Sequence, residues 1–427
     1  MRKIKNKIKE VEDSMLESEK FESNVRNYCR HFPKVFTKAK LCKMYTPEGE
    51  EYLDFFSGAG TLNYGHNNEY IMERIINYIK DDGILHALDM YTTAKCDFIK
   101  KFQDCILAPR NYNYKMMFCG PSGTNANEAA LKIARKYTGR KNVIAFMGAF
   151  HGMSLGSLAL TSSLFARNGA GVQLENTIFV PYCRKGFDSL EYIKMILNDD
   201  HSGIEKPAAI FVETVQCEGG VQVADFEWLK ELDKICKENH ILLVCDDIQV
   251  GCGRTGTFFS FEQAGIEPDM VTLSKSISGG GLPMSLLLLK PEIDCLEPGE
   301  HSGTFRGNQL AFIGASAAID YAIEHKLWDK VQNDEKYVKE YIEQNILPIN
   351  NKIQYRGKGL IFGIDFSNFN NEKLTDEISK ECFANGLIIE LAGRKDSVLK
   401  IIPPLIISRD ELTAGLNIIK KSIQACV

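Results

Sequence analysis

The chain has 427 residues, which corresponds to two or three domains of ordinary size. Hydrophobic residues make up 44% and charged residues 25%, so collagen-like, disordered and disulfide-stabilised miniprotein classes are excluded. With 51 Lys+Arg and 56 Asp+Glu, the net charge is -5, and no basic block favours nucleic acid as a partner.

Neither the cysteines nor the N-terminus points to export or to a membrane. The 13 cysteines include no C-x-x-C pair, which predicts reduced, buried thiols rather than a disulfide framework. Residues 1–20 are polar, unlike a secretory signal, and we expect them to form a solvated helix or a frayed tail. No apolar run approaches the ~20 residues of a membrane span. We therefore expect a soluble, cytoplasmic protein.

Two patterns follow one another along the first three quarters of the chain. In residues 21–65 short apolar stretches alternate with turns, and Pro47-Glu48-Gly49 predicts a hairpin before EYLDFF. In residues 66–308, strand-like KNVIAF, AAIFVE, ILLVCD and DMVTLS alternate with helix-like NEAALKIARKYTG and EWLKELDKICKENH. This alternation indicates a parallel sheet covered by helices on both faces.

Residues 309–427 are mixed. We expect one helical stretch in AFIGASAAIDYAIEHKLWDKV, a hairpin in IQYRGKGLIFGIDF, a helix in KLTDEISKECFANG and a strand in SVLKIIPPLII. Together with residues 21–65 they predict a smaller α+β domain beside a large domain of residues 66–308, after the polar extension of residues 1–20.

Two acids end the buried strand ILLVCD. Asp246 and Asp247 stand at its carboxyl end, where ligands collect in open α/β sheets. A buried acid there requires a cation, a metal or a proton donor. For either residue taken alone, a solvated loop acid is the open alternative.

A lysine ends the next strand. Lys275 follows DMVTLS and precedes the run Gly279-Gly280-Gly281, a place suited to a Schiff base with a carbonyl compound. Taken alone, Lys275 could equally be an ordinary surface lysine.

The segment GPSGTNANEAALKIARK opens a helix with small residues. Ser122 or Thr124 can cap the helix, and the free N–H groups near Gly123 can bind a phosphate. The helical spacing places Ala134 and Tyr137 on the apolar face of this helix.

An aromatic pair follows the strand-like NVIAF. Phe150 could cover one face of a flat ring, with His151 beside it. The alternatives are a core phenylalanine and a structural histidine.

Residues 251–256, GCGRTG, match the dinucleotide fingerprint G-x-G-x-x-G. No amphipathic helix start follows, the acid pair before the loop has the wrong sign for a pyrophosphate, and no acid lies ~20 residues on. A nicotinamide oxidoreductase is therefore the disfavoured alternative. The chain has no P-loop motif and no His/Cys cluster with zinc spacing, so we expect no metal site.

Taken together, a phosphate-binding helix start, a covering aromatic, a strand-end acid and a strand-end lysine describe a site for pyridoxal phosphate (PLP). The aldehyde needs an amine, the ring nitrogen needs an anion, the phosphate needs fixed donors and the ring needs an apolar cover.

The chain also resembles the class III, fold type I PLP-dependent aminotransferases. The stretches that carry the resemblance are FPKVFTKAK, GAGTLNYGHNN, GPSGTNANEAALKIARK, CDDIQVGCGRTG, TLSKSISGGGLPM and EHSGTFRGN. Within this family it is most similar to the diaminobutyrate–2-oxoglutarate transaminases of ectoine biosynthesis. The resemblance implies an α/β fold with a mostly parallel seven-stranded sheet and a smaller α+β domain.

The resemblance also implies residue roles. Lys275 and Asp246 would be catalytic, as the cofactor-binding amine and the partner of the ring nitrogen. The other cofactor residues would be Ser122, Gly123, Thr124, Phe150, His151, Ile248, Gln249 and, from the neighbouring subunit of a homodimer, Thr304. Glu213 and Glu218 match the acidic pair of the family near the substrate.

Two positions depart from the family. Met153 replaces an arginine that grips a substrate carboxylate in relatives acting on GABA, ornithine or acetylornithine, which argues against those activities. Lys400 replaces an arginine that many relatives use for 2-oxoglutarate, and Arg306 is a spare candidate for that contact.

The expected reaction interconverts L-aspartate 4-semialdehyde plus L-glutamate with L-2,4-diaminobutyrate plus 2-oxoglutarate. The alternatives are a class III aminotransferase for another ω-amino acid or diamine, and a non-catalytic binding scaffold.

Overall fold

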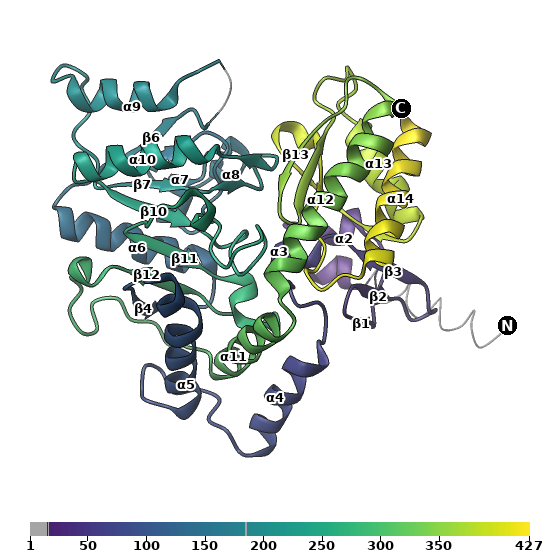
Figure 1. Ribbon diagram of the computed structural model, residues 1–427, viewed down its shortest axis with the longest axis horizontal. Helices are drawn as coiled ribbons and strands as arrows, with labels where there is room; N and C mark the ends of the chain where they lie inside the picture. Colours follow the sequence, from purple (N-terminus) through teal and green to yellow (C-terminus); the bar gives the residue numbers. More distant parts are fainter. Residues whose placement is uncertain (1–14, 16, 184–185) are drawn as a thin grey trace.

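The computed structural model describes residue 15, residues 17–183 and residues 186–427. Most of the expected polar extension of residues 1–20 lies outside the described residues. A larger body built on a long sheet stands beside a smaller body that holds the C-terminus and the first strands (Figure 1). Within the described ranges, no helix combines the length and the apolar character needed to cross a membrane.

The larger body is built on a seven-stranded sheet. Its strands are, in spatial order, β4 (Lys115–Phe118), β12 (Leu286–Leu289), β11 (Met270–Leu273), β10 (Leu242–Asp246), β7 (Ala209–Val212), β5 (Val143–Phe146) and β6 (Thr177–Val180). All neighbours are parallel except β12, which is antiparallel to both β4 and β11. The predicted fold class and the four predicted strands are therefore confirmed.

Helices cover both faces of this sheet. The face with α6 (Gly123–Thr138) buries Leu242 and Val244 of β10, whereas Leu243 and Cys245 join the core on the opposite face. Helices α5 (Thr93–Phe102), α9 (Ser189–Asn198) and α10 (Phe226–Glu238) contribute to that opposite core. Because strand side chains alternate, Asp246 follows Leu242 and Val244 towards the α6 side.

One predicted core residue is wrong. Tyr137 is 47% exposed, although helical spacing places it below Ala134. It lies in the last turn of α6, just before the chain turns away at Gly139, whose φ is +68°.

The smaller body contains two four-stranded sheets that confirm both predicted hairpins. The first has the order β1 (Lys38–Lys40), β2 (Lys43–Tyr45), β3 (Glu51–Asp54) and β15 (Leu387–Ile388); the second has the order β13 (Gln354–Lys358), β14 (Ile361–Asp365), β17 (Val398–Ile401) and β16 (Glu390–Ala392). The predicted C-terminal strand is shorter than expected. It ends at Ile401 because Pro403 and Pro404 offer no N–H to a neighbouring strand.

Helices complete the smaller body and connect it to the larger body. The expected single stretch after residue 309 is two helices, α11 (Gln309–Glu324) and α12 (Leu327–Asn345), and Lys326 between them has a positive φ of 47°. The predicted helix α13 (Leu374–Ala384) packs with α14 (Arg409–Cys426). The remaining helices and short strands are α2 (Tyr28–His31), α3 (Ser57–Gly60), α4 (Glu69–Lys80), α7 (Leu155–Leu160), α8 (Leu164–Arg167), β8 (Val215–Gln216) and β9 (Gln222–Val223).

The glycine motif of residues 251–256 forms a series of turns, and no α-helix begins directly behind it. At its centre Arg254 is fully buried. Its Nη1 donates to the carbonyls of Leu360 (3.0 Å) and Pro403, and its Nη2 donates to Asn63 Oδ1 (2.6 Å). Burial lowers the pKa of Arg254 to about 9. The motif therefore connects the two bodies and lacks the helix that a dinucleotide loop requires.

Candidate active site

A cavity of about 310 Å³ lies at the carboxyl ends of β10 and β11. Its lining unites nine of the predicted cofactor residues from four separate segments: Ser122, Gly123, Thr124, Phe150, His151, Asp246, Ile248, Gln249 and Lys275. Glu213, Glu218 and Met153 also line it, whereas Thr304, Arg306 and Lys400 do not.

One wall is the start of α6. Ser122 caps the helix and exchanges capping-box contacts with Asn125. The N–H groups of Gly123 and Thr124 belong to the first turn, which has no acceptor within its own helix. A Cβ on Gly123 would lie 2.9 Å from Ile248 Cδ1, so the narrow gap there requires glycine. The result is a cradle of free donors at a positive helix end, which suits a phosphate.

The opposite end of the cavity is acidic. Asp246 Oδ2 accepts hydrogen bonds from Asn127 Nδ2 and His151 Nδ1, both at 2.7 Å, and Oδ1 accepts from the N–H of Ile248 at 3.2 Å. Among the described residues, His151 is the only ion-pair partner of Asp246. The other ring nitrogen of His151, Nε2, is buried and has no hydrogen-bond partner in the part of the chain that the structure describes.

A second carboxyl lies near Asp246. Glu213 is 8% exposed and accepts from the N–H of Phe150 at 3.3 Å. Burial, reinforced by the charge of Asp246, raises the pKa of Glu213 well above its usual range. Neither buried carboxyl forms an ion pair with a lysine or arginine of the described ranges, an arrangement that suits a cationic N–H group.

Lys275 occupies a strained position at the end of β11. Its φ is +52°, a conformation that a side chain disfavours and that often marks functional sites. Its Nζ donates to the carbonyl of Ala59 at 2.9 Å, and Gln249 Nε2 donates to the same oxygen at 2.9 Å. Burial lowers the pKa of Lys275, against an opposing effect of Glu218, so more of the amine is neutral and nucleophilic.

Lys400 is fully buried between two carboxylates. Its Nζ lies 2.7 Å from Glu218 Oε1 and 2.8 Å from Glu390 Oε2. Tyr28 Oη donates to Glu390 Oε1 at 3.1 Å. Burial opposes ionisation of Glu218, but Lys400 and Lys275 outweigh it and lower the pKa of Glu218; for Glu390 burial prevails and raises the pKa. The charge of Lys400 is thus balanced by two carboxylates of the protein itself.

The sequence offered no sign of Glu390 or Tyr28, because they lie 362 residues apart and meet only in the fold. The remaining predicted residues lie outside the cavity. Thr304 is exposed, and its carbonyl accepts from His86 Nε2 at 2.8 Å. Arg306 Nη1 donates to the carbonyl of His301 at 2.9 Å.

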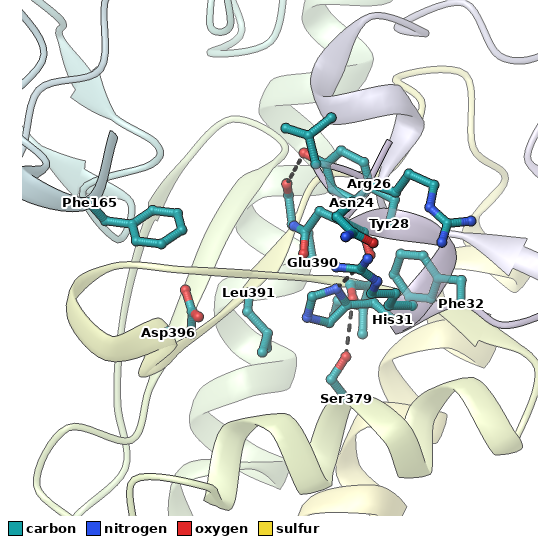
Figure 2. A pocket seen from close by; sticks show the side chains of 14 residues that line it. Asn24, Arg26, Tyr28, His31, Phe32, Phe165, Ser379, Glu390, Leu391 and Asp396 are labelled. Carbon is teal, nitrogen blue, oxygen red and sulfur yellow. Dashed lines mark hydrogen bonds between the residues drawn. The ribbon is translucent and has the colours of Figure 1, made fainter. Parts of the chain in front are cut away.

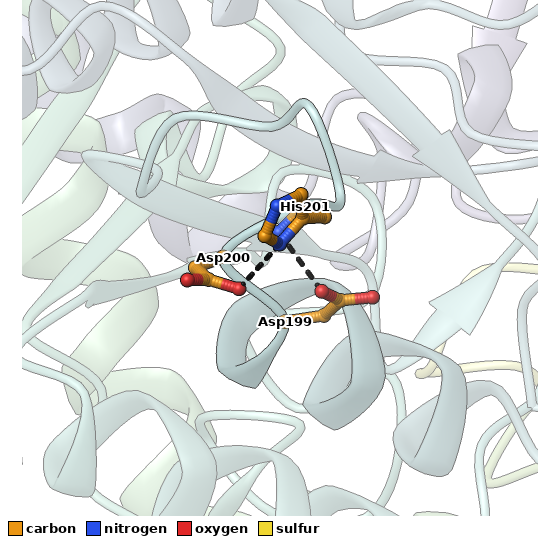
Figure 3. A group of neighbouring side chains, drawn as sticks. All are labelled: Asp199, Asp200 and His201. Carbon is orange, nitrogen blue, oxygen red and sulfur yellow. Dashed lines mark hydrogen bonds and ion pairs between the residues drawn. The ribbon is translucent and has the colours of Figure 1, made fainter.

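Within the described ranges, one group of side chains has the spacing of a metal site: Asp199, Asp200 and His201 (Figure 3). All three are exposed, and none lines the cavity. His201 Nδ1 donates to Asp200 Oδ1 at 2.7 Å, so the group satisfies itself on the surface.

Comparison with known proteins gives consistent matches. Residues 25–423 match the family model of aminotransferase class-III. The chain is 49% identical over 413 residues to a diaminobutyrate–2-oxoglutarate transaminase of Halalkalibacterium halodurans, covering 96% of each protein. It is 49% identical over 409 residues to the transaminase of the same name from Wolinella succinogenes, covering 95% of each.

The comparison with solved structures also finds aminotransferases. The ornithine aminotransferase of Toxoplasma gondii, in a crystal with partial occupancy of PLP at its active site, superposes with a TM-score of 0.84 at 25% identity. The superposition covers 97% of this chain and 94% of that one.

Proposed function

This chain belongs to the class III aminotransferases, and we propose that it transfers an amino group between L-glutamate and L-aspartate 4-semialdehyde, forming L-2,4-diaminobutyrate and 2-oxoglutarate. The family assignment confirms the predicted enzyme class and the PLP cofactor. The specific reaction is supported by relatives of that name, which match almost their entire length. The alternative, another ω-amino acid or diamine, has no such support.

The residues of the cavity fit PLP. The N–H groups of Gly123 and Thr124 would hold its phosphate, and Phe150 and Ile248 would cover the two ring faces. Asp246 would hold the proton on the ring nitrogen, since it is buried, oriented by three hydrogen bonds and, among the described residues, not bound to a lysine or arginine. Gln249 would lie near the phenolic oxygen.

When bound, PLP supplies an aldehyde that accepts the amino group and a protonated ring that takes up electrons from the broken C–H bond. Lys275 Nζ is the amine that would hold the aldehyde in the resting enzyme. Once displaced by the substrate amine, Lys275 Nζ would take the proton from the carbon that bears this amine and pass it to the carbon of the former aldehyde. Its lowered pKa keeps a fraction of Nζ ready for this transfer.

Four finer features are part of the proposal. We propose a homodimer in which Thr304, which is exposed and outside the cavity of its own chain, reaches the phosphate bound to the other subunit. We also propose a cytoplasmic location and a role in ectoine biosynthesis, in line with the resemblance. Finally, Met153 at the cavity wall carries no charge, which supports a preference against GABA and ornithine.

The observation that carries the proposal is the pairing of a strained, partly buried Lys275 with an acidic cavity end at Asp246. A panel of amino donors tests the substrate, because diaminobutyrate should have a higher kcat/KM than ornithine or GABA. Equal or lower kcat/KM for diaminobutyrate would disprove the specific reaction. In parallel, Lys275→Ala should abolish both turnover and the visible absorbance band that borohydride removes.

A further inference from the structure

The smaller body has two segments of interest near the active site. The N-terminal segment with Tyr28 borders a cavity of about 580 Å³ (Figure 2). In the part of the chain that the structure describes, no residue lines both this cavity and the active-site cavity. The second segment is the turn at residues 57–60, which touches Lys275 directly, because the carbonyl of Ala59 accepts from Lys275 Nζ at 2.9 Å. The turn, rather than the larger cavity, can therefore act on the reacting amine.

This turn is left-handed at four successive residues. The φ angle is +49° at Ser57, +56° at Gly58, +55° at Ala59 and +83° at Gly60. Two of the four carry a side chain, and side chains disfavour this conformation. A strained conformation persists only where the surrounding structure holds it, so the question is which groups hold this turn.

The side chain of Asp54 holds the start of the turn. Asp54 ends β3 and is 1% exposed. Its Oδ1 accepts from the N–H groups of Phe56 and Ser57, both at 2.8 Å, and its Oδ2 accepts from His66 Nε2 at 2.8 Å. Two backbone hydrogen bonds with Leu41 fix His66 in turn. Because both oxygens of Asp54 are engaged in a buried place, the turn cannot relax without breaking charge-assisted hydrogen bonds.

The carbonyl of Ala59 meets two donors at the active site. Lys275 Nζ and Gln249 Nε2 each donate to it at 2.9 Å, which uses both lone pairs of the oxygen. A neutral amine has a single lone pair, and an N–H donated to a fixed carbonyl restricts where that lone pair points. Proton transfer depends on this direction and on the distance to the proton. The turn therefore sets the position from which Lys275 can accept a proton.

We propose that Asp54, supported by His66, is a positioning residue for the amino transfer. Asp54 holds the turn at residues 57–60 in its left-handed form, so that the carbonyl of Ala59 docks the amine of Lys275 whenever this amine is free. Neither Asp54 nor His66 lines the active-site cavity, and Asp54 acts through the backbone alone. The inference rests on the proposed function, in which Lys275 transfers the proton.

The first test is a crystal structure of the cofactor-free Asp54→Ala protein. Without the carboxylate, residues 57–60 should leave the left-handed region, and Lys275 Nζ should move out of hydrogen-bond distance of the Ala59 oxygen. Asp54→Asn keeps an oxygen for the two N–H groups, so its turn should stay. An Asp54→Ala structure with the same turn and the same contact to Lys275 would overturn the proposal.

The second test follows proton transfer in the loaded enzyme. Asp54→Ala should lower kcat for glutamate by about 100-fold, because the amine is misplaced, and change KM by less than about threefold. Asp54→Asn should stay within about fivefold of the wild type. With glutamate deuterated at the carbon that bears the amine, the isotope effect of Asp54→Ala should equal or exceed that of the wild type. A smaller isotope effect would mean that another step had become limiting, and would overturn the proposal.

A matched control separates positioning from general damage. Asp365 is also a buried acid of the smaller body; it accepts from the N–H of Ser367 at 2.8 Å and pairs with Arg356 at 2.7 Å, and it does not line the active-site cavity. Asp365→Ala should lower the melting temperature but keep kcat within about twofold. An equal loss of kcat in Asp365→Ala and Asp54→Ala would overturn the proposal.

His66→Ala provides a milder variant that serves if Asp54→Ala does not fold. It removes one of the three donors to Asp54, so kcat should fall by about tenfold with the same isotope pattern. A His66→Ala enzyme with wild-type kcat would remove His66 from the proposal. If the wild type transfers no amino group from glutamate, the proposed function fails, and the cofactor-free structures still decide whether Asp54 positions Lys275.

Discussion

The acidic end of the active-site cavity, with Asp246, differs from the Lys400 cluster, which we define as Lys400, Glu218 and Glu390. The difference lies in how the charges of each group are balanced. Asp246 is held by neutral donors and His151, with no lysine or arginine bound to it among the described residues. Lys400 sits in direct contact with two carboxylates. The first arrangement leaves a charge for a ligand to balance, whereas the second balances its charges within the protein. The uncompensated carboxylate of Asp246 thus marks a place where a cationic ligand group can bind, whereas Lys400 already has its counter-charges.

Removing the cation of the Lys400 cluster tests this difference most strongly. Lys400→Met removes the cation that binds both Glu218 and Glu390, so the free energy of unfolding should fall by about 3–5 kcal/mol. Calorimetric melting of the loaded enzyme measures the loss. Adding Glu218→Gln and Glu390→Gln to the same chain should restore most of the melting temperature. A Lys400→Met enzyme as stable as the wild type would show that the cluster is not the closed ion network described above.

Asp246 should matter for catalysis rather than for stability. Asp246→Asn should reduce kcat by about 100- to 1000-fold, because an amide cannot hold the proton on the ring nitrogen. The neighbouring Asp247→Asn is the matched control, since Asp247 accepts from Ser260 on the other side of the sheet and does not line the cavity. Equal losses in the two variants would remove the distinction between these adjacent acids.

The third prediction concerns pH and Asp247. Burial raises the pKa of Asp247 to about 7 from an ordinary value of 3.8. The folded state therefore holds this proton more tightly than the unfolded state, and the stabilisation is lost as pH rises through about 7. Between about pH 5 and pH 8 the wild type should lose roughly 2–3 kcal/mol relative to Asp247→Asn. Melting temperatures of the two proteins across this range measure how their stability depends on pH. The same pH dependence in both proteins would contradict a raised pKa for Asp247.

Much of the cofactor cavity was predictable because its residues lie at strand ends and a helix start. Asp246 and Lys275 end apolar strands, and Gly123 opens a helix, so local patterns place them at one edge of the sheet. The prediction from residues alone could not separate Asp246 from Asp247. Strand alternation does so once the α6 face is known.

The features that sequence reasoning missed depend on contacts between distant segments. The antiparallel direction of β12 cannot be read from a run of leucines, since an apolar run has no direction. The ion cluster around Lys400 likewise draws Glu218, Glu390 and Tyr28 from separate segments, so no local pattern could reveal it.

Arg254 has a consequence for how substrates enter. Separating the two bodies would break the hydrogen bonds from its guanidinium to Leu360, Pro403 and Asn63 at once. A wide rotation of one body relative to the other would therefore cost the energy of all three hydrogen bonds. Substrates would therefore reach the active-site cavity while the two bodies stay joined at Arg254.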